Sequence, residues 1–200
     1  LQWGQTGLFN VGVAGFVAIG AYASAILTTP DGNHLCGFGL PIFVGWIGAM
    51  IASGFAAAII GAITLRLRAD YLAITTFGIA IVIQLFALNA QSITGGAFGI
   101  GFIPRPFVSL AEHALAFNLA NLAMVAIVTL VVFLALERLV RSPWGRVLRA
   151  IREDETAARS LGKNSNRFRL QAFVLGSAVI GLAGAWQGHF IGFIAPENYL

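Results

Sequence analysis

Five long apolar stretches separated by shorter polar links constrain this chain more than any other feature. The hydrocarbon core of a bilayer is about 30 Å thick, and about 20 apolar residues cross it as a helix whose backbone groups pair with one another. With 58% hydrophobic and 10% charged residues, the chain is far more apolar than a soluble domain. The sequence predicts an all-α, polytopic transmembrane helical bundle. Its spans are expected at about 7–28, 40–65, 71–90, 116–140 and 170–194.

The charges in the links indicate how this bundle is oriented. The link at 141–169 holds eight of the twelve basic residues, and two more lie at 66–70 after the second span. The remaining two links together contain one basic residue, Arg105. Because basic residues favour the cytoplasmic side of a membrane, the two basic links are expected in the cytoplasm and the other two outside.

The basic link at 141–169 contains an amphipathic segment that is too charged to cross a membrane. Ser142 followed by Pro143 predicts the start of a helix, and Gly162 predicts its end. At 100° per residue, the basic and acidic side chains gather on one face of this helix. The opposite face carries Trp144, Val147, Leu148, Ile151 and Ala158.

Two environments suit this helix. Glu155 interrupts the apolar face and can pair with Arg152 and Arg159, unless the helix breaks nearby into two short pieces. The element either lies among anionic lipid headgroups or projects into the cytoplasm and binds a soluble partner. The three consecutive acids that begin at Glu153 would be repelled by anionic headgroups, which slightly favours the soluble partner.

Polar side chains within the spans must contact other helices or water, because lipid cannot satisfy their hydrogen bonds. The candidates for a translocation path are Asn10, Thr75, Thr76 and Gln84. The middle of each predicted span lacks charged residues, which argues against an ion-coupled carrier or a proton pump. A path of neutral amides and hydroxyls suits a permeant that crosses unchanged.

Glycine marks two further regions. The last span repeats a small residue every fourth position, which predicts close helix packing on one face. The link from Ser92 to Pro106 has four glycines and two prolines, so it is expected to avoid regular helix and to form either a re-entrant loop or an ordinary outer loop. The repeated glycines of the last span are Gly184, Gly188 and Gly192.

Several other functions are excluded by the residue pattern. The basic residues alternate with long apolar runs and not with aromatic residues, so nucleic-acid binding is not expected. Lys163 follows a glycine, but Ala157 and Asn164 replace the first glycine and the Ser or Thr of a phosphate-binding loop, so ATP must be hydrolysed by another subunit if it is used at all. Cys36 has no partner at metal-ligand spacing, and neither a cofactor nor a metal is expected.

The three histidines do not suggest an enzyme. His34, His113 and His189 are far apart in the sequence, and two of them lie in outer links. An intramembrane enzyme would need a nucleophile with its base, or a metal cluster, inside the spans. We therefore expect the histidines to be solvated or interfacial, and the chain to have no catalytic activity of its own.

Four stretches resemble one family. The run SPWGRVLRAIREDETAARSLGKNSNRFRLQAFVLGSAVIGLAGA, at 142–185, is similar to the cytoplasmic loop and following helix of LivM-type permeases of branched-chain amino-acid ABC importers. The stretches at 7–22, 71–78 and 93–106 also resemble that family, so the similarity covers nearly the whole chain in order.

The resemblance implies a single transmembrane permease domain at 1–200, incomplete at both ends, with a cytoplasmic coupling loop at 142–167. It implies ABC ATPase subunits, a second permease subunit, a periplasmic substrate-binding protein and lipid as partners, in a bacterial inner membrane. Ala158 and Gly162 also match the alanine and glycine of the broader ABC permease loop. With these two, the implied ATPase-coupling residues are Arg149, Ile151, Arg152, Glu153, Asp154, Glu155, Ala158 and Gly162.

The chain departs from the family at three positions within its spans. Val13 replaces a histidine that many relatives have, while Ile81 and Gln84 replace a glutamate and an arginine. If these positions contribute to the path, the permeant differs from leucine, isoleucine and valine. A permease for urea or short amides is therefore the alternative, with an ion-coupled secondary carrier as a more distant one.

Overall fold

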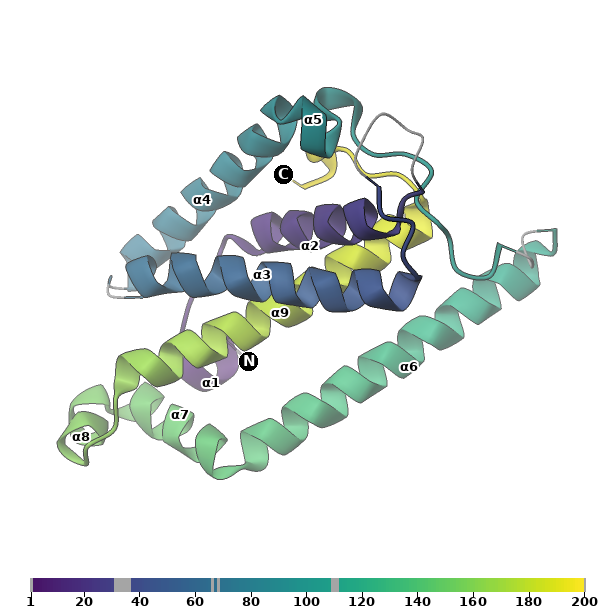
Figure 1. The fold of residues 1–200 in the computed structure, drawn as a ribbon. Helices are drawn as coiled ribbons and strands as arrows, with labels where there is room; N and C mark the ends of the chain where they lie inside the picture. The colour runs from purple at the N-terminus through teal and green to yellow at the C-terminus, as the bar shows by residue number, and fades with distance from the viewer. Residues whose placement is uncertain (1, 31–36, 66, 68, 109–111, 200) are drawn as a thin grey trace.

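The computed structural model describes residues 2–30, 37–65, 67, 69–108 and 112–199. These residues form helices joined by loops, with one isolated bridge between Ile100 and Ile194, and they confirm the predicted all-α bundle (Figure 1). Two short 3₁₀ helices are η1 (Gly96–Phe98) and η3 (Pro196–Tyr199). The α-helices are α1 (Gln2–Thr6), α2 (Val13–Thr28), α3 (Ile42–Thr64), α4 (Ala69–Asn89), α5 (Gln91–Thr94), α6 (Ala114–Arg141), α7 (Pro143–Glu153), α8 (Glu155–Ser160) and α9 (Ser165–Ile191).

The centre of the bundle is the close packing of α2, α3 and α9. A Cβ atom at Gly20 of α2 would overlap the backbone of Gly181 in α9, and one at Gly184 would overlap the carbonyl of Val17. Small residues thus let the backbones approach closely, as the sequence predicts for Gly184. Gly192 has a different role, because its φ of +76° places it at the C-terminal cap of α9.

The first predicted span is a broken helix. Its long helix begins at Val13 and has 16 residues, which extend about 24 Å at 1.5 Å per residue, less than the thickness of the hydrocarbon core. The short helix α1 precedes it, and Gly7 in the intervening segment has a φ of +68° that glycine readily adopts. Four other helices are long and apolar enough to cross a membrane: α3, α4 from Tyr71, α6 and α9. The chain is therefore a multi-pass membrane protein.

Helix α6 stands apart from the other spans in the described part of the chain. Only 6% of its most apolar 18-residue segment is buried. It contacts the bundle mainly through α7, which follows it, and through Met124 and Val128, which pack near Trp46 of α3. Figure 1 shows α6 running alongside α9 and joining α7 at a sharp bend. A movement of α7 would therefore also act on α6.

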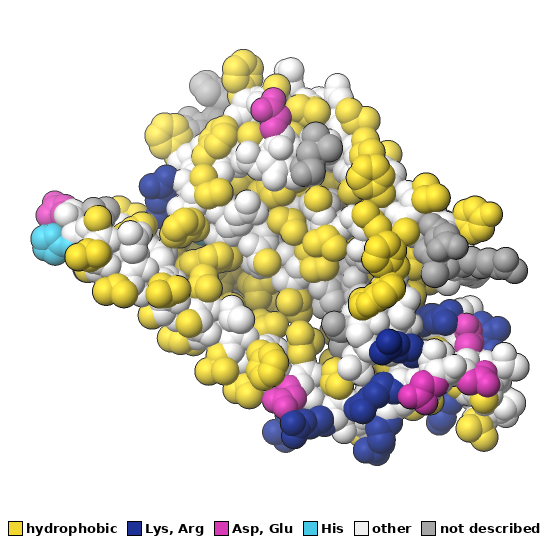
Figure 2. Space-filling view, turned by 180° about the vertical axis from the view of Figure 1, so that it is seen from behind, with side chains coloured by type: hydrophobic (Ala, Val, Ile, Leu, Met, Phe, Trp, Pro, Cys, Tyr) yellow, Lys and Arg dark blue, Asp and Glu magenta, His cyan; other side chains and the backbone are white. Residues whose placement is uncertain are grey.

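The helix ends next to the two predicted cytoplasmic links lie at one end of the bundle. In Figure 1 the end of α3, the start of α4, the helices α7 and α8 and the start of α9 are all at this end, while Arg66 and Arg68 of the first basic link lie outside the described residues. Figure 2 shows most of the charged side chains gathered around α7 and α8, while hydrophobic side chains cover much of the remaining face. The basic end of the bundle is therefore the one that carries α7 and α8, and its placement in the cytoplasm stays a prediction.

Candidate functional site

The break between α1 and α2 brings several amide groups together. The Nδ2 atom of Asn10 donates to Oε1 of Gln2 at 3.1 Å, and its Oδ1 atom accepts from the backbone N–H of Gly12. The Nε2 atom of Gln2 donates to the carbonyl of Phe173 at 3.0 Å and to Oγ of Ser177 at 3.3 Å, both in α9. Asn10 therefore faces a neighbouring helix, as expected of an in-span polar residue.

Thr76 is the second predicted path residue at this break. Its hydroxyl accepts a hydrogen bond from the backbone N–H of Val11 at 3.2 Å and donates to the carbonyl of Ala73. The side chain is buried, and a Cβ atom at Gly12 would overlap the carbonyl of Thr76. Thr76 thus supplies an acceptor where the broken helix has no intrahelical one.

Thr75 and Gln84 do not join this site. The hydroxyl of Thr75 donates to the carbonyl of Tyr71, four residues earlier in its own helix, so it needs neither another helix nor water. Gln84 is buried and donates to the carbonyl of Pro196 at 3.3 Å. It lines a separate cavity of about 150 Å³ beside Tyr199. The four predicted path residues therefore do not form one site: Asn10 and Thr76 each bond at the helix break, and Thr75 and Gln84 lie elsewhere.

A cavity of about 450 Å³ lies beside the helix break. It is mostly apolar, with the amides of Gln2 and Asn10 in its wall, and such a lining suits an apolar solute that carries a few polar groups. Sequence reasoning missed Gln2, because it precedes the predicted span at 7–28 and its partners in α9 are far away in the sequence. The lining residues are Gln2, Trp3, Leu8, Phe9, Asn10, Val13, Leu136, Gly176, Val179 and Ile180.

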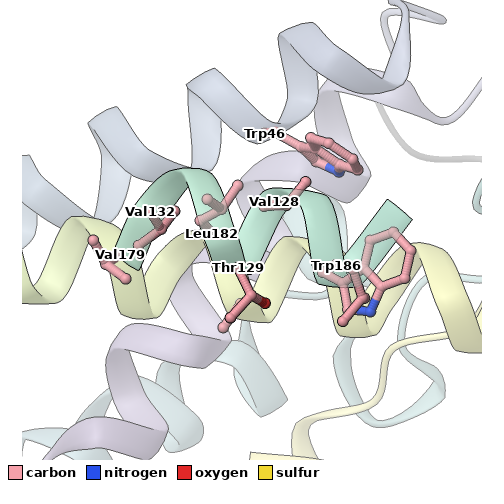
Figure 3. Close-up of a pocket in the computed structure, with 9 residues that line it drawn as sticks. Trp46, Val128, Thr129, Val132, Val179, Leu182 and Trp186 are labelled. Carbon is pink, nitrogen blue, oxygen red and sulfur yellow. The ribbon is translucent and has the colours of Figure 1, made fainter. Parts of the chain in front are cut away.

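A second cavity of about 220 Å³ lies between α3, α6 and α9 (Figure 3). Trp46 and Trp186 stand at one end of it, with their rings at an edge-to-face angle, and Val132 and Val179 lie at the other. Apart from Thr129, its lining side chains are valine, leucine, alanine and tryptophan. This lining suits an apolar side chain or lipid tail and has few groups that could bind a charged solute.

The predicted coupling helix is two helices that meet at Asp154. Pro143 occupies the first turn of α7 as predicted, but the hydroxyl of Ser142 donates backward to Leu139 and does not cap α7. The carboxylate of Asp154 instead caps α8 by accepting from the backbone N–H of Ala157 at 3.0 Å. Gly162 ends α8 with a φ of +77°, as predicted.

The predicted coupling residues on α7 point in different directions. Ile151 is buried against the bundle, so it is unavailable to a partner. Arg149 donates to the carbonyl of Val140 at the end of α6, and Arg152 donates to the carbonyl of Gly4 in α1 at 2.6 Å. Glu153 is exposed. Among these side chains, Glu153 is the one left facing outward.

Glu155 pairs with Arg159 in α8 at 2.6 Å, as predicted, and its other oxygen pairs with Arg169 of α9 at 2.8 Å. The expected pair with Arg152 does not form. Ala158 is buried between these elements, so α8 is held against α9 by its apolar face and by Glu155. Leu161, at the end of α8, is 78% exposed in a charged region and was not singled out from the sequence.

His189 was expected to be solvated or interfacial, and this expectation is wrong. Its ring is fully buried, with Nε2 2.8 Å from Oγ of Ser24 and Nδ1 2.8 Å from the carbonyl of Pro104. It is a structural link between α2, α9 and the outer loop. Within the described residues, no group of three His, Cys, Asp or Glu side chains could hold a metal ion.

The outer loop from Gly95 onward is attached to the end of α9. Ile100 exchanges backbone hydrogen bonds with Ile194, and the N–H of Ile103 donates to Gly192. Both isoleucines of the loop are buried, whereas Phe102 between them is 81% exposed and has a φ of +56°. The segment is neither a spanning helix nor a free loop, because its backbone is fixed against the bundle.

The whole chain, residues 1–200, matches the family of the branched-chain amino acid transport system permease component. It is 37% identical to the high-affinity branched-chain amino acid transport system permease protein LivM of Escherichia coli K12, over 98% of this chain and 49% of that protein. The corresponding protein of Salmonella typhimurium is 36% identical over the same shares.

The permease protein LivH of Escherichia coli K12 is 28% identical over 98% of this chain and 66% of that protein. No solved structure matches the chain. The chain spans about half the length of the LivM proteins that it matches. The match over its full length, with the helical bundle described above, shows that this chain belongs to the branched-chain amino acid transport permease family.

Proposed function

We propose that this chain belongs to the membrane-spanning permease subunit of an ATP-binding-cassette importer, which carries branched-chain amino acids across a bacterial inner membrane. The observation that carries the proposal is the α7–α8 element in a chain of this family. One face of the element is buried against the bundle through Leu148, Ile151 and Ala158, and the other is exposed. A separate ATPase subunit would bind the exposed face and supply the energy.

The ATPase would contact the outward side of the α7–α8 turn. Glu153, Thr156, Ala157, Ser160 and Leu161 are exposed there. Acidic and polar side chains around one apolar residue fit a soluble protein surface better than a lipid headgroup layer. Leu161 would be the apolar anchor of this contact, and the residues around it would form its polar rim.

Two further partners follow from this assignment. The relatives include both LivM and LivH permease proteins, which supports a second permease subunit beside this one. A periplasmic binding protein would meet the outer loop, where Phe98 and Phe102 are 89% and 81% exposed. Large exposed aromatic side chains on a rigid loop are suited to a partner with apolar pockets.

The proposed permeant is a branched-chain amino acid that crosses chemically unchanged. The cavity at the helix break combines apolar side chains with the amides of Gln2 and Asn10. Apolar walls suit a branched side chain, and amides can both donate and accept hydrogen bonds for its charged ends. Neither the family nor the named relatives favour a urea or amide importer.

Reconstitution would test the class of transporter. The full-length permease, its second permease and the ATPase subunits are placed in liposomes with the binding protein, and uptake of labelled leucine is measured. We expect uptake that requires ATP hydrolysis and is competed by isoleucine and valine but not by urea. Uptake that follows an ion gradient without ATP would identify a secondary carrier and overturn the proposal.

A matched pair of variants would test the docking surface. Leu161→Asp at the α7–α8 end should remove most of the ATPase that co-purifies with the permease. Leu115→Asp is the control, because Leu115 is similarly exposed but lies in the first turn of α6 at the opposite end. An acid in a first helical turn is also well tolerated. Equal ATPase recovery with both variants would place the contact elsewhere.

A further inference from the structure

Arg152 links the coupling element to the helix break. Its Nη1 atom donates to the carbonyl of Gly4 in α1 at 2.6 Å, although 148 residues separate the two in sequence. Leu148 and Ile151 of the same helix are fully buried. The side of α7 that carries these residues therefore faces the bundle, with α1 among its neighbours.

The side chain of Arg152 also lies against the point where the chain leaves α1. A Cβ atom at Gly7 would be 3.7 Å from Cγ of Arg152, so the aliphatic part of the arginine lies beside this glycine. Gly7 has a φ of +68°, a conformation that lets the chain turn between α1 and the segment before α2. Arg152 thus contacts α1 at its carbonyl and at its exit.

Helix α1 is in turn joined to the cavity at the break. Gln2 bonds to α9 through Phe173 and Ser177, and it accepts from Asn10, which lies just before α2. Gln2 and Asn10 both line the cavity of about 450 Å³. A displacement of α1 would therefore move one wall of this cavity and change the hydrogen bonds of its two amides.

We propose that Arg152 is a positioning residue that transmits displacement of α7 to α1 and so opens or closes the cavity between the broken helix and α9. The inference rests on the proposed function and assigns a mechanical connection within it. A charge-assisted hydrogen bond to a backbone carbonyl makes α1 follow α7, while Gly7 allows α1 to move relative to α2. Arg152 acts toward the membrane domain, and the ATPase binds other residues of the same element.

The test uses the full-length permease with its partner permease, ATPase subunits and binding protein in liposomes. Arg152→Ala is compared with Arg152→Lys, which keeps a charged donor, and with Arg146→Ala, an exposed residue on the same helix. ATPase co-purification, ATP hydrolysis and leucine uptake are measured for each. We expect Arg152→Ala to lower uptake by about tenfold, the effect of losing one charge-assisted hydrogen bond, while co-purification and hydrolysis stay near the unaltered level. Arg152→Lys should restore part of the uptake.

A distance measurement provides a second, direct readout. In a variant with Cys36 replaced by serine, spin labels are placed at Gly4→Cys, where a Cβ atom meets no other atom within 4 Å, and at Ile63→Cys on the exposed side of α3. The distance between labels is measured with and without trapped nucleotide. We expect a nucleotide-dependent shift in the otherwise unaltered complex and no shift when Arg152→Ala is added.

The outcomes separate this inference from the proposed function. If Arg152→Ala loses the ATPase itself, Arg152 faces the partner and the inference is wrong, while the importer assignment stands. If uptake and the label distance respond normally in Arg152→Ala, the connection through α1 is also wrong. Failure of the unaltered complex to bind an ATPase or to require ATP would instead remove the proposed function.

Discussion

The Nε2 atom of His189 in α9 lies 2.8 Å from the Oγ atom of Ser24 in α2. The other ring nitrogen, Nδ1, lies 2.8 Å from the carbonyl oxygen of Pro104, which can only accept a hydrogen bond. Nδ1 therefore donates to Pro104, and in the neutral ring Nε2 accepts a hydrogen bond from the hydroxyl of Ser24. One imidazole thus joins two spans and the outer loop.

Replacing this imidazole should destabilise the bundle. His189→Ala leaves the buried hydroxyl of Ser24 and the part-buried carbonyl of Pro104 without their partner and also opens a cavity. We expect a loss of about 2–4 kcal/mol in the free energy of unfolding. The measurement is thermal or denaturant unfolding in detergent, with His113→Ala at an exposed position as the control. Similar stability for the two variants would show that this link contributes little.

The close contact between α2 and α9 leads to a second prediction, which compares the substitution of two glycines. Gly20→Val would push a side chain into the backbone of Gly181, whereas a Cβ atom at Gly78 of α4 meets nothing within 4 Å. We expect Gly20→Val to abolish or strongly reduce recovery of folded protein, and Gly78→Val to be recovered normally. Size-exclusion chromatography of the two detergent-extracted variants distinguishes these outcomes. Normal recovery of Gly20→Val would show that the helices can separate at low cost.

Adjacent threonines in α4 offer a matched pair at the helix break. Thr76→Val removes the acceptor for the N–H of Val11, and Thr75→Val removes only a bond within its own helix. Because the first change leaves the part-buried N–H of Val11 without a partner, we expect it to cost about 1 kcal/mol of stability. Leucine uptake by Thr76→Val should also fall, because the start of α2 loses its position. Equal uptake by both variants would exclude Thr76 from the path.

Phe102 provides a prediction in which stability and binding change in opposite directions. Its φ of +56° is unfavourable for a bulky residue, so Phe102→Gly should stabilise the fold by about 1 kcal/mol. The same change removes an exposed aromatic side chain and should lower the affinity for the periplasmic binding protein. Surface plasmon resonance would measure this affinity. Phe98→Ala, without a positive φ, should weaken binding without stabilising the fold. Unchanged affinity in both variants would place the docking surface elsewhere.

The sequence predicted the elements that depend on local composition. Apolar length gave α3, α4, α6 and α9, and the residue types at Pro143 and Gly162 gave the start of α7 and the end of α8. These predictions succeed because the apolar length of a span and the backbone preferences of Pro and Gly are local properties, which can be seen in a short stretch of sequence.

The sequence does not predict the break before α2, because Asn10 is expected to be a polar residue within a continuous spanning helix that begins at Gly7. What stabilises the break is the contact of Val11 with Thr76 and of Asn10 with Gln2, which in turn bonds to α9, and the bonds to Thr76 and α9 join distant parts of the chain. The contact of Arg152 with α1 is not predictable for the same reason, because its partner Gly4 is 148 residues away in the sequence. The sequence of an amphipathic helix predicts which side chains face the bundle, whereas the residues that they contact depend on the tertiary fold.

The shortness of α2 has a consequence for water. A helix of 16 residues leaves the segment before Val13 below the surface of the bilayer, at a depth where lipid alone would leave peptide groups unsolvated. Thr76 and Asn10 bond the N–H groups of Val11 and Gly12 at this level, and the cavity at the break offers a route by which water reaches the amides in its wall. A membrane-impermeant thiol reagent applied from the cytoplasmic side should accordingly label a cysteine that replaces Asn10, although this position lies below the surface of the bilayer.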